Sequence, residues 1–226
     1  LLFWLILGGG LGSSFRLAGA PRGVSYLQFL FPGILLMIVL FVMLFATISV
    51  IEDRRSGFLQ GVLVAPGSRA SMVAGKLLGL TTLALVQAAI FLALAPFAAI
   101  PLAEARWGLL LVTLLLTCLG LGSATFALAW VSPSAQAYHA IMGVLLLPLW
   151  VLSGAMFPGT VGGASPWIGA VMAANPLTYA VNGLRHALAI PGASATAPTS
   201  LLALVIFCVV GLALALIACR RQGGRR

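Results

Sequence analysis

Long apolar runs separated by short polar segments dominate the pattern of this chain. The runs lie at residues 1–13, 27–51, 77–99, 107–131, 139–157 and 200–219. Apart from the first, each run holds about 20 residues without alternation of polar and apolar positions, which is typical of a helix that crosses a bilayer. The strands of a membrane barrel would instead alternate over roughly 10 residues. The pattern therefore predicts an all-α membrane protein with six transmembrane helices.

The run at 1–13 is too short for a complete span, which needs about 20 residues. The chain begins at Leu1 inside this run, and no basic residue precedes it as a signal peptide would require. We expect the first transmembrane helix to be truncated here, with its start in a segment upstream.

The composition agrees with a membrane location. Hydrophobic residues make up 62% of the 226 positions and charged residues 7%, whereas soluble domains carry about 25% charged residues. So few charges cannot cover a surface that faces water, and the surrounding solvent is expected to be lipid. The net charge of +9 does not indicate nucleic acid, because the basic residues lie in the loops and the C-terminal tail, where they orient a membrane protein.

The distribution of Lys and Arg between the loops predicts the orientation of the chain. One side of the membrane receives eight of them: Arg54, Arg55, Arg69, Lys76, Arg220, Arg221, Arg225 and Arg226. The other side receives four: Arg16, Arg22, Arg106 and Arg185. Because the more basic side faces the cytoplasm, we expect segment 52–76 and both termini to be cytoplasmic.

The stretch at 158–199 is then outside the cell. It is apolar enough to touch the bilayer, but Pro166 and Pro176 interrupt it, and neither half is long enough to cross. We expect two short helices that enter the outer leaflet and return, sheltered by protein. A seventh span through 167–190 is the alternative, but it would carry Asn175, Arg185 and His186 through lipid and reverse the position of the C-terminal arginines.

The spans offer almost no groups for catalysis or ion transport, which usually require ionisable side chains within the membrane. Gln87 is the most polar side chain in the middle of a span. It could line a transport pathway or form a hydrogen bond to a neighbouring helix. The cysteines, Cys118, Cys208 and Cys219, have no metal-ligand spacing, and we interpret them as small packing residues. No metal site is expected.

Two short motifs resemble nucleotide-binding elements without completing them. Gly75-Lys76 lacks both the glycine five residues earlier and the Ser or Thr after the lysine that a phosphate-binding loop needs, since Ala70 and Leu77 stand there. The sequence LSGAM at 152–156 resembles the signature loop of transport ATPases but lies at the end of an apolar run. We therefore expect no enzymatic site in this chain, and any ATP-derived energy would come from another polypeptide.

The charged segment 52–76 predicts a short helix from Arg54 to Ala65 that ends at Pro66. An apolar stripe along this helix is formed by Phe58, Leu59, Val62 and Leu63. One interpretation is an amphipathic helix that lies among the lipid headgroups. The other is a docking element for a groove on a cytosolic protein. The pattern alone leaves both open.

Two stretches of the sequence resemble the ABC-2 type transporter permeases, the membrane subunits of bacterial ABC exporters. The first is EDRRSGFLQGVLVAPGSRASMVAGK, in which the matching positions are Glu52, Gly57, Leu63, Pro66, Ser68, Arg69, Gly75 and Lys76. Gln60 stands where many members have Glu. The second is NPLTYAVNGLR, with Asn175 followed by the matching residues Pro176, Leu177, Tyr179 and Arg185.

The resemblance covers essentially the whole chain and implies one ABC-2 type transmembrane domain over residues 1–226, with a cytoplasmic coupling segment at 52–76 and an outer re-entrant region at 158–199. The amphipathic helix that normally precedes the first span in this family is missing. The residues that the resemblance assigns to ATPase coupling are Glu52, Asp53, Arg54, Gly57, Phe58, Leu63, Pro66 and Arg69.

The resemblance also implies a function and partners. The chain is similar to daunorubicin and multidrug efflux permeases, which suggests drug export and antibiotic resistance from a bacterial inner membrane. It would pair with a second copy or a related permease and bind cytosolic ATPase subunits that hold ATP and Mg, so no cofactor is expected in this chain. The alternatives are a self-contained transporter, a membrane-embedded enzyme or a non-transporting scaffold.

Overall fold

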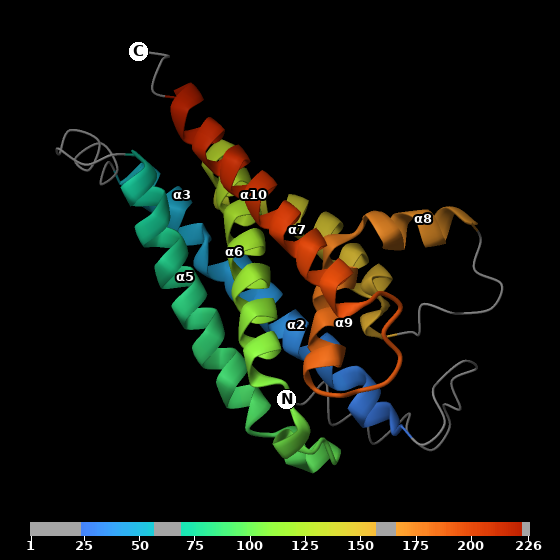
Figure 1. The fold of residues 1–226 in the computed structure, drawn as a ribbon. Helices are drawn as coiled ribbons and strands as arrows, with labels where there is room; N and C mark the ends of the chain where they lie inside the picture. Colours follow the sequence, from blue (N-terminus) through green and yellow to red (C-terminus); the bar gives the residue numbers. More distant parts are fainter. Residues whose placement is uncertain (1–23, 57–68, 157–165, 223–226) are drawn as a thin grey trace.

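The computed structural model describes residues 24–56, 69–156 and 166–222. Every regular element in these ranges is helical, as the sequence predicted. The helices are α2 (Tyr26–Ala46), α3 (Ile48–Arg55), α5 (Arg69–Leu92), α6 (Trp107–Val131), α7 (Ala135–Trp150), α8 (Pro166–Ala174), α9 (Pro176–Ala187) and α10 (Ala197–Gln222) (Figure 1). Shorter helical turns are η1 (Ala95–Ala98), η2 (Leu102–Glu104) and the π-helical η3 (Val151–Ala155).

Five helices of the described ranges are long and apolar enough to cross a membrane. They are Tyr26–Arg55, Ala70–Leu92, Trp107–Val131, Ala135–Ala155 and Ala197–Arg220. Each overlaps one of the predicted spans after the first. The run at 1–13 and most of the predicted helix from Arg54 to Ala65 lie outside the described residues, so the six-span count and the coupling helix stay predictions.

The third predicted span, 77–99, is displaced from the helix that forms there. α5 begins at Arg69 and ends at Leu92, and residues after it form the turn η1, which contains Pro96. Hydropathy locates the part of a helix that suits lipid, whereas the helix itself continues into the polar segment that carries Lys76. It ends before Pro96, which lacks the backbone N–H that a continuing helix needs.

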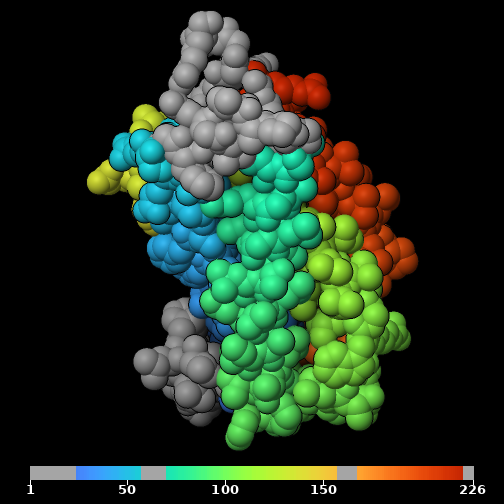
Figure 2. All heavy atoms as spheres, turned by 90° about the vertical axis from the view of Figure 1, so that its left-hand side faces the viewer, coloured from blue at the N-terminus to red at the C-terminus, as the bar shows by residue number. Residues whose placement is uncertain are grey.

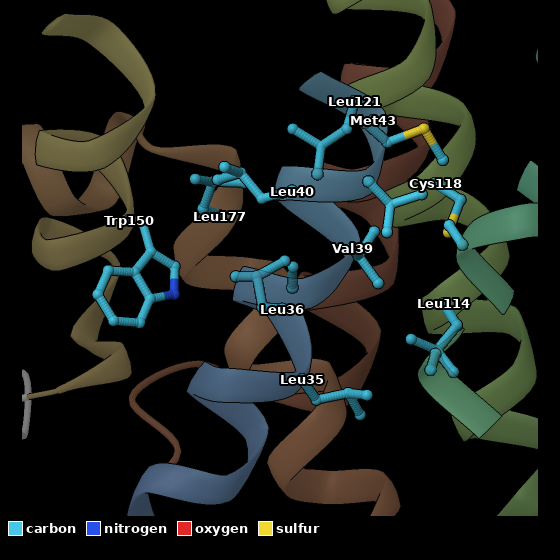
Figure 3. Close-up of a cluster of buried hydrophobic side chains, with 14 of the residues drawn as sticks. Leu35, Leu36, Val39, Leu40, Met43, Leu114, Cys118, Leu121, Trp150 and Leu177 are labelled. Atoms are coloured by element: carbon cyan, nitrogen blue, oxygen red, sulfur yellow. The ribbon is translucent and has the colours of Figure 1, made fainter. Parts of the chain in front are cut away.

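α2 is the central helix of the bundle. Of its 21 residues, 14 are buried, and it contacts α5, α6, α9 and η3. Figure 3 shows Trp150 and Leu177 on one side of α2, and Leu114 and Cys118 of α6 on the other. A helix that is apolar around its whole circumference is suited to this position. Ser25 and Gln28 close its first turn with a reciprocal capping box.

Glycine allows α6 and α10 to pack closely, side by side in Figure 1. A Cβ at Gly120 would lie 2.5 Å from Cδ1 of Phe207, and one at Gly211 would lie 3.1 Å from Cβ of Ser123. Small residues at such positions bring helix backbones together in a membrane. By contrast, a Cβ at Gly75 or Gly79 would meet nothing within 4 Å, so the glycine spacing on α5 serves no contact among the described residues.

The faces that α5, α7 and α10 turn outward are apolar. Figure 2 shows the α5 side, with α2 and α3 next to it. On α5, Leu78 is 63% and Ile90 64% exposed. On α7, Val144 is 78% exposed, and on α10, Leu202 is 62% exposed. Surfaces of this kind suit lipid or another membrane subunit.

The stretch before the last span forms two short helices, α8 with 9 residues and α9 with 12. The chain breaks between them at Asn175, and Pro176 occupies the first turn of α9, where its missing N–H costs nothing. Neither helix has the roughly 20 residues of a span. The two predicted short helices are therefore confirmed and a continuous seventh span is wrong, while their depth in a bilayer stays a prediction.

Candidate functional site

Two groups of polar side chains lie at opposite ends of the bundle. The first, called the charged end, comprises Asp53, Arg54, Arg55 and Lys76, and it lies where α3 ends and α5 begins. The second, called the arginine cluster, comprises Arg106, Arg185 and His186, and it lies where α9 ends and α6 begins. The separation follows from the helix connections visible in Figure 1.

At the charged end, two arginines of α3 bind the end of α6. Arg54 donates hydrogen bonds from both terminal nitrogens, to the carbonyl oxygens of Trp130 and Ser132. Arg55 donates to the carbonyl oxygen of Pro133 at 3.1 Å. The last carbonyls of a helix have no partners within it and carry its partial negative charge. The two arginines therefore provide hydrogen-bond donors to the carbonyls at the end of α6 and offset its partial negative charge. The same bonds hold α3 against α6.

An ion pair joins α3 to α5. The Nζ atom of Lys76 lies 2.7 Å from Oδ2 of Asp53, and the two side chains are 30% and 33% exposed. A pair with this much exposure contributes about 0–1 kcal/mol to stability. Its importance is positional, because it holds the beginning of α5 to the end of α3. The nearby Glu52 side chain is exposed and has no partner among the described residues.

The structure thus brings together part of the predicted coupling set. Asp53 and Arg54 contact neighbouring helices, and Glu52 lies beside them on the surface. Gly57, Phe58, Leu63 and Pro66 lie outside the described residues, and so does the side chain of Arg69, whose backbone begins α5. Segment 57–68 lies between α3 and α5 in the sequence, so the charged end holds both of its attachment points.

Arg185 is the centre of the second group. It is 2% exposed and is the largest of the fully buried side chains. Its Nη2 atom donates to the carbonyl oxygen of Gly154 at 2.8 Å, and its Nη1 atom to that of Gly192 at 3.2 Å. Its guanidinium carbon lies 4.2 Å from the centroid of the Phe29 ring. One side chain of α9 therefore binds η3, the loop before α10, and α2.

The charge of Arg185 has no carboxylate partner. The whole sequence has three acidic residues, and the ion pair recorded among the described residues is Lys76–Asp53. Burial lowers the pKa of Arg185 to about 10, so the guanidinium stays protonated near neutral pH. Two carbonyl dipoles and the face of Phe29 compensate part of its lost hydration, and its Nε atom has no partner among the described residues.

The other residues of the NPLTYAVNGLR stretch shape the turn that positions Arg185. Asn175 accepts the backbone N–H of Leu177 at 3.0 Å and donates to the carbonyl oxygen of Leu149 at 2.6 Å. Tyr179 donates to the carbonyl oxygen of Ala173 at 2.8 Å, across the α8–α9 turn. Leu177 is buried in the core. These contacts give the motif residues a structural role.

Two apolar grooves lie on the bundle. The first has a volume of about 470 Å³ between α6, α7, α9 and α10. Its lining includes Leu121, Thr125, Leu128, Met142, Leu145, Leu146, Leu149, Leu177, Phe207 and Leu214. Sequence reasoning missed this groove, because its residues come from four separate helices and are indistinguishable from other apolar positions. Thr125 is the polar residue of its wall.

Gln87 lies in the second groove, of about 510 Å³, between α2 and α5. Its side chain is exposed and makes no hydrogen bond among the described residues, so the expected bond to a neighbouring helix is absent there. The neighbours in the groove are apolar residues, among them Phe41 and Phe45. A role in a pathway stays a prediction. The three cysteines are buried and none of them forms a disulfide, in agreement with packing positions.

Comparison with known proteins identifies the family. Residues 17–217 match the ABC-2 family transporter protein. A relative in Cyanophora paradoxa, named as transport permease ycf38, is 32% identical over 189 residues, which cover 81% of this chain and 63% of the relative. A relative of the same name in Porphyra purpurea is 30% identical over 188 residues, covering 82% and 64%. The chain thus spans slightly less than two thirds of the length of these relatives.

The family match extends over both stretches that carry the resemblance, the charged segment and the NPLTYAVNGLR turn. The five apolar helices of the described ranges agree with a membrane location. The chain therefore belongs to the ABC-2 family of transporter proteins and is a multi-pass membrane protein.

Proposed function

We propose that the chain is the permease subunit of an ATP-driven ABC exporter and takes its energy from a separate cytosolic ATPase, which holds ATP and Mg. The observation that carries the proposal is the charged end, where α3 is bound to α6 through Arg54 and to α5 through the Asp53–Lys76 pair. Family membership supports an ATPase partner. The cytoplasmic position of this end rests on its excess of Lys and Arg.

The charged end supports a mechanical connection between the ATPase and the spans. α3 follows α2 after the single residue Thr47, so a force applied next to segment 57–68 reaches the central helix directly. The hydrogen bonds of Arg54 and the ion pair of Lys76 pass the same displacement to α6 and α5. Three spans then move as one unit. Glu52 and Arg55 are exposed on this end and offer charges to the partner.

The assembly that we propose contains two permeases, either two copies or one copy with a related permease, and two ATPase subunits in a bacterial cell membrane. The exposed apolar faces of α7 and α10 support a partner within the membrane. For the substrate, the groove between α6, α7, α9 and α10 supports a hydrophobic or amphipathic compound, because its wall is almost wholly apolar. A drug-like molecule is the first candidate, and a lipid or a glycan is the next.

Reconstitution tests this function. The full-length protein is placed in inverted vesicles with its ATPase, and uptake of a hydrophobic fluorescent dye is measured with ATP, without ATP, and with an ATPase variant that binds but does not hydrolyse ATP. Uptake that requires ATP hydrolysis supports the proposal. Uptake that continues without hydrolysis and follows an ion gradient instead would establish a self-contained transporter and contradict it.

A further inference from the structure

A basic pocket lies at the arginine cluster, at the end of the bundle opposite the charged end. Its volume is about 340 Å³, and its lining comprises Arg106, Arg185, His186 and residues 189–193. Arg106 is exposed and its side chain has no hydrogen bond among the described residues. His186 Nε2 lies 2.8 Å from the carbonyl oxygen of Ala195. None of the described residues that line the pocket carries a carboxylate.

The pocket is built into the fold. The backbone N–H of Arg106 donates to the carbonyl oxygen of Ala187 at 2.8 Å, which fixes the start of α6 beside the end of α9. α6 begins at Trp107 without a side-chain cap, so the partial positive charge of its first turn remains at this end. Arg106 and Arg185, which are far apart in the sequence, therefore line the same pocket.

The buried positive charge of Arg185 is only partly compensated by the groups around it. A buried cation without an acidic partner is costly unless other groups compensate it. Two carbonyl oxygens and the Phe29 ring compensate Arg185 in part, and Nε has no partner among the described residues. A bound anion would compensate the remaining charge. Arginine binds planar or tetrahedral oxyanions through several parallel hydrogen bonds, and phosphate fits this geometry.

We propose that the pocket lined by Arg106, Arg185 and His186 binds a phosphate group, either in the headgroup of an anionic lipid or as free phosphate. Arg106 reaches the phosphate from the exposed side, and Arg185 supplies charge from the buried side. The bound phosphate completes the hydrogen bonding of the α6–α9 junction. The site is separate from the charged end, where we place the ATPase.

Thermal unfolding of the purified full-length protein in non-ionic detergent tests the site. Dioleoyl phosphatidylglycerol, dioleoylglycerol and inorganic phosphate are titrated separately. The two lipids share their acyl chains and differ in the phosphoglycerol headgroup, so their difference isolates the headgroup, and the titration with inorganic phosphate tests the phosphate alone. A ligand that binds the folded state raises the unfolding temperature with its concentration, and the titration yields an apparent Kd. We expect phosphatidylglycerol to stabilise the protein at concentrations where dioleoylglycerol does not.

Two matched variants locate the effect. Arg106→Gln removes one charge from the pocket without breaking a hydrogen bond among the described residues, and we expect it to weaken phosphatidylglycerol binding about tenfold, the loss typical of one charged hydrogen bond. Arg220→Gln removes one exposed charge from α10 at the opposite end and should leave the Kd unchanged. Arg185 itself is left intact, because it also holds the fold together.

The titration with inorganic phosphate distinguishes the two possible sources of the phosphate group. If inorganic phosphate stabilises the wild-type protein and competes with phosphatidylglycerol, the site accepts free phosphate; if only the lipid acts, the site selects a headgroup at the membrane surface. Equal effects of the two lipids together with no effect of phosphate would overturn the proposal, and so would equal losses in the two variants. Because no ATPase is present, either result leaves the transport function unaffected.

Discussion

The guanidinium carbon of Arg185 lies 4.2 Å from the centre of the Phe29 ring, and this contact joins the short helix α9 to the central helix α2. The same arginine binds the carbonyl oxygen of Gly154 at the end of the fifth predicted span. Three parts of the chain that are far apart in the sequence are therefore held by one buried side chain. The family motif residue that ends NPLTYAVNGLR acts here as a clamp.

Replacing Phe29 with Leu should destabilise the protein by about 1–3 kcal/mol, through loss of buried aromatic area and of the cation–π contact. Thermal unfolding in detergent measures this loss. A matched substitution, Phe97→Leu, changes a ring that is 79% exposed and should have little effect. In a double-mutant cycle with Arg185→Met, additive losses would show that the ring and the guanidinium do not interact.

Gly33→Ala should prevent the close contact between α2 and η3. A Cβ at Gly33 would lie 2.7 Å from the carbonyl oxygen of Ala155, a backbone atom that cannot rotate away. We expect a loss of about 1–3 kcal/mol from overpacking, seen as a lower unfolding temperature. Gly75→Ala is the control, because its Cβ would meet nothing within 4 Å and alanine favours the helix. Equal stability of the two variants would contradict the described packing.

Arg54→Gln should separate ATP hydrolysis from transport. The variant loses the hydrogen bonds to Trp130 and Ser132, which weakens the connection between α3 and α6 and leaves the hydrogen bond of Arg55 to Pro133. In vesicles with the ATPase, we expect hydrolysis to continue while the amount of dye moved per ATP falls several-fold. Arg220→Gln serves as the matched loss of charge. Normal transport per ATP in Arg54→Gln would exclude this connection between α3 and α6.

Lys76→Met should change stability by less than about 1 kcal/mol, because its ion pair with Asp53 is partly exposed and weak in water. The small difference should shrink further as salt is added. Unfolding temperatures at low and high ionic strength measure it. A large loss that salt does not reduce would mean that the pair is a major source of stability and not chiefly a positional contact.

A bulky residue in the apolar groove should impair movement of a hydrophobic compound. Leu145 lines the groove, whereas Leu147, two residues further along α7, does not; the two are 49% and 43% exposed. We expect Leu145→Trp to lower the rate of ATP-dependent dye uptake, and Leu147→Trp to leave it close to that of the wild-type protein. Equal rates in both variants would remove this groove from the substrate pathway.

The sequence predicted five of the spans and the two short helices before the last one, because each depends on a local property. An apolar run of bilayer length indicates a span, and Pro176 marks the break between α8 and α9. The start of α5 was missed, because a helix can extend beyond the lipid into a charged segment. Arg69 and Lys76 look like loop residues to a hydropathy pattern.

The contacts that organise the candidate sites were beyond sequence reasoning. Arg185 was recognised through its motif, but its ring partner Phe29 is one aromatic residue within a wholly apolar run. Arg54 meets backbone carbonyls, which any sequence could supply. The Asp53–Lys76 pair joins different helices and follows no helical spacing. Such contacts depend on which helices become neighbours. Because the chain is almost uniformly apolar, the choice of neighbours depends on many similar side chains and not on a few distinctive ones.

The central position of α2 has a consequence for biosynthesis. Its neighbours α6, α9 and η3 all come later in the chain, and a chain emerges from the ribosome N-terminal end first. α2 therefore enters the bilayer before the helices that will cover it have been translated. Its all-round apolar surface makes lipid an acceptable temporary neighbour, and each later helix replaces lipid with protein along one of its sides. The central helix of this bundle is therefore inserted before the helices α6, α9 and η3 that enclose it.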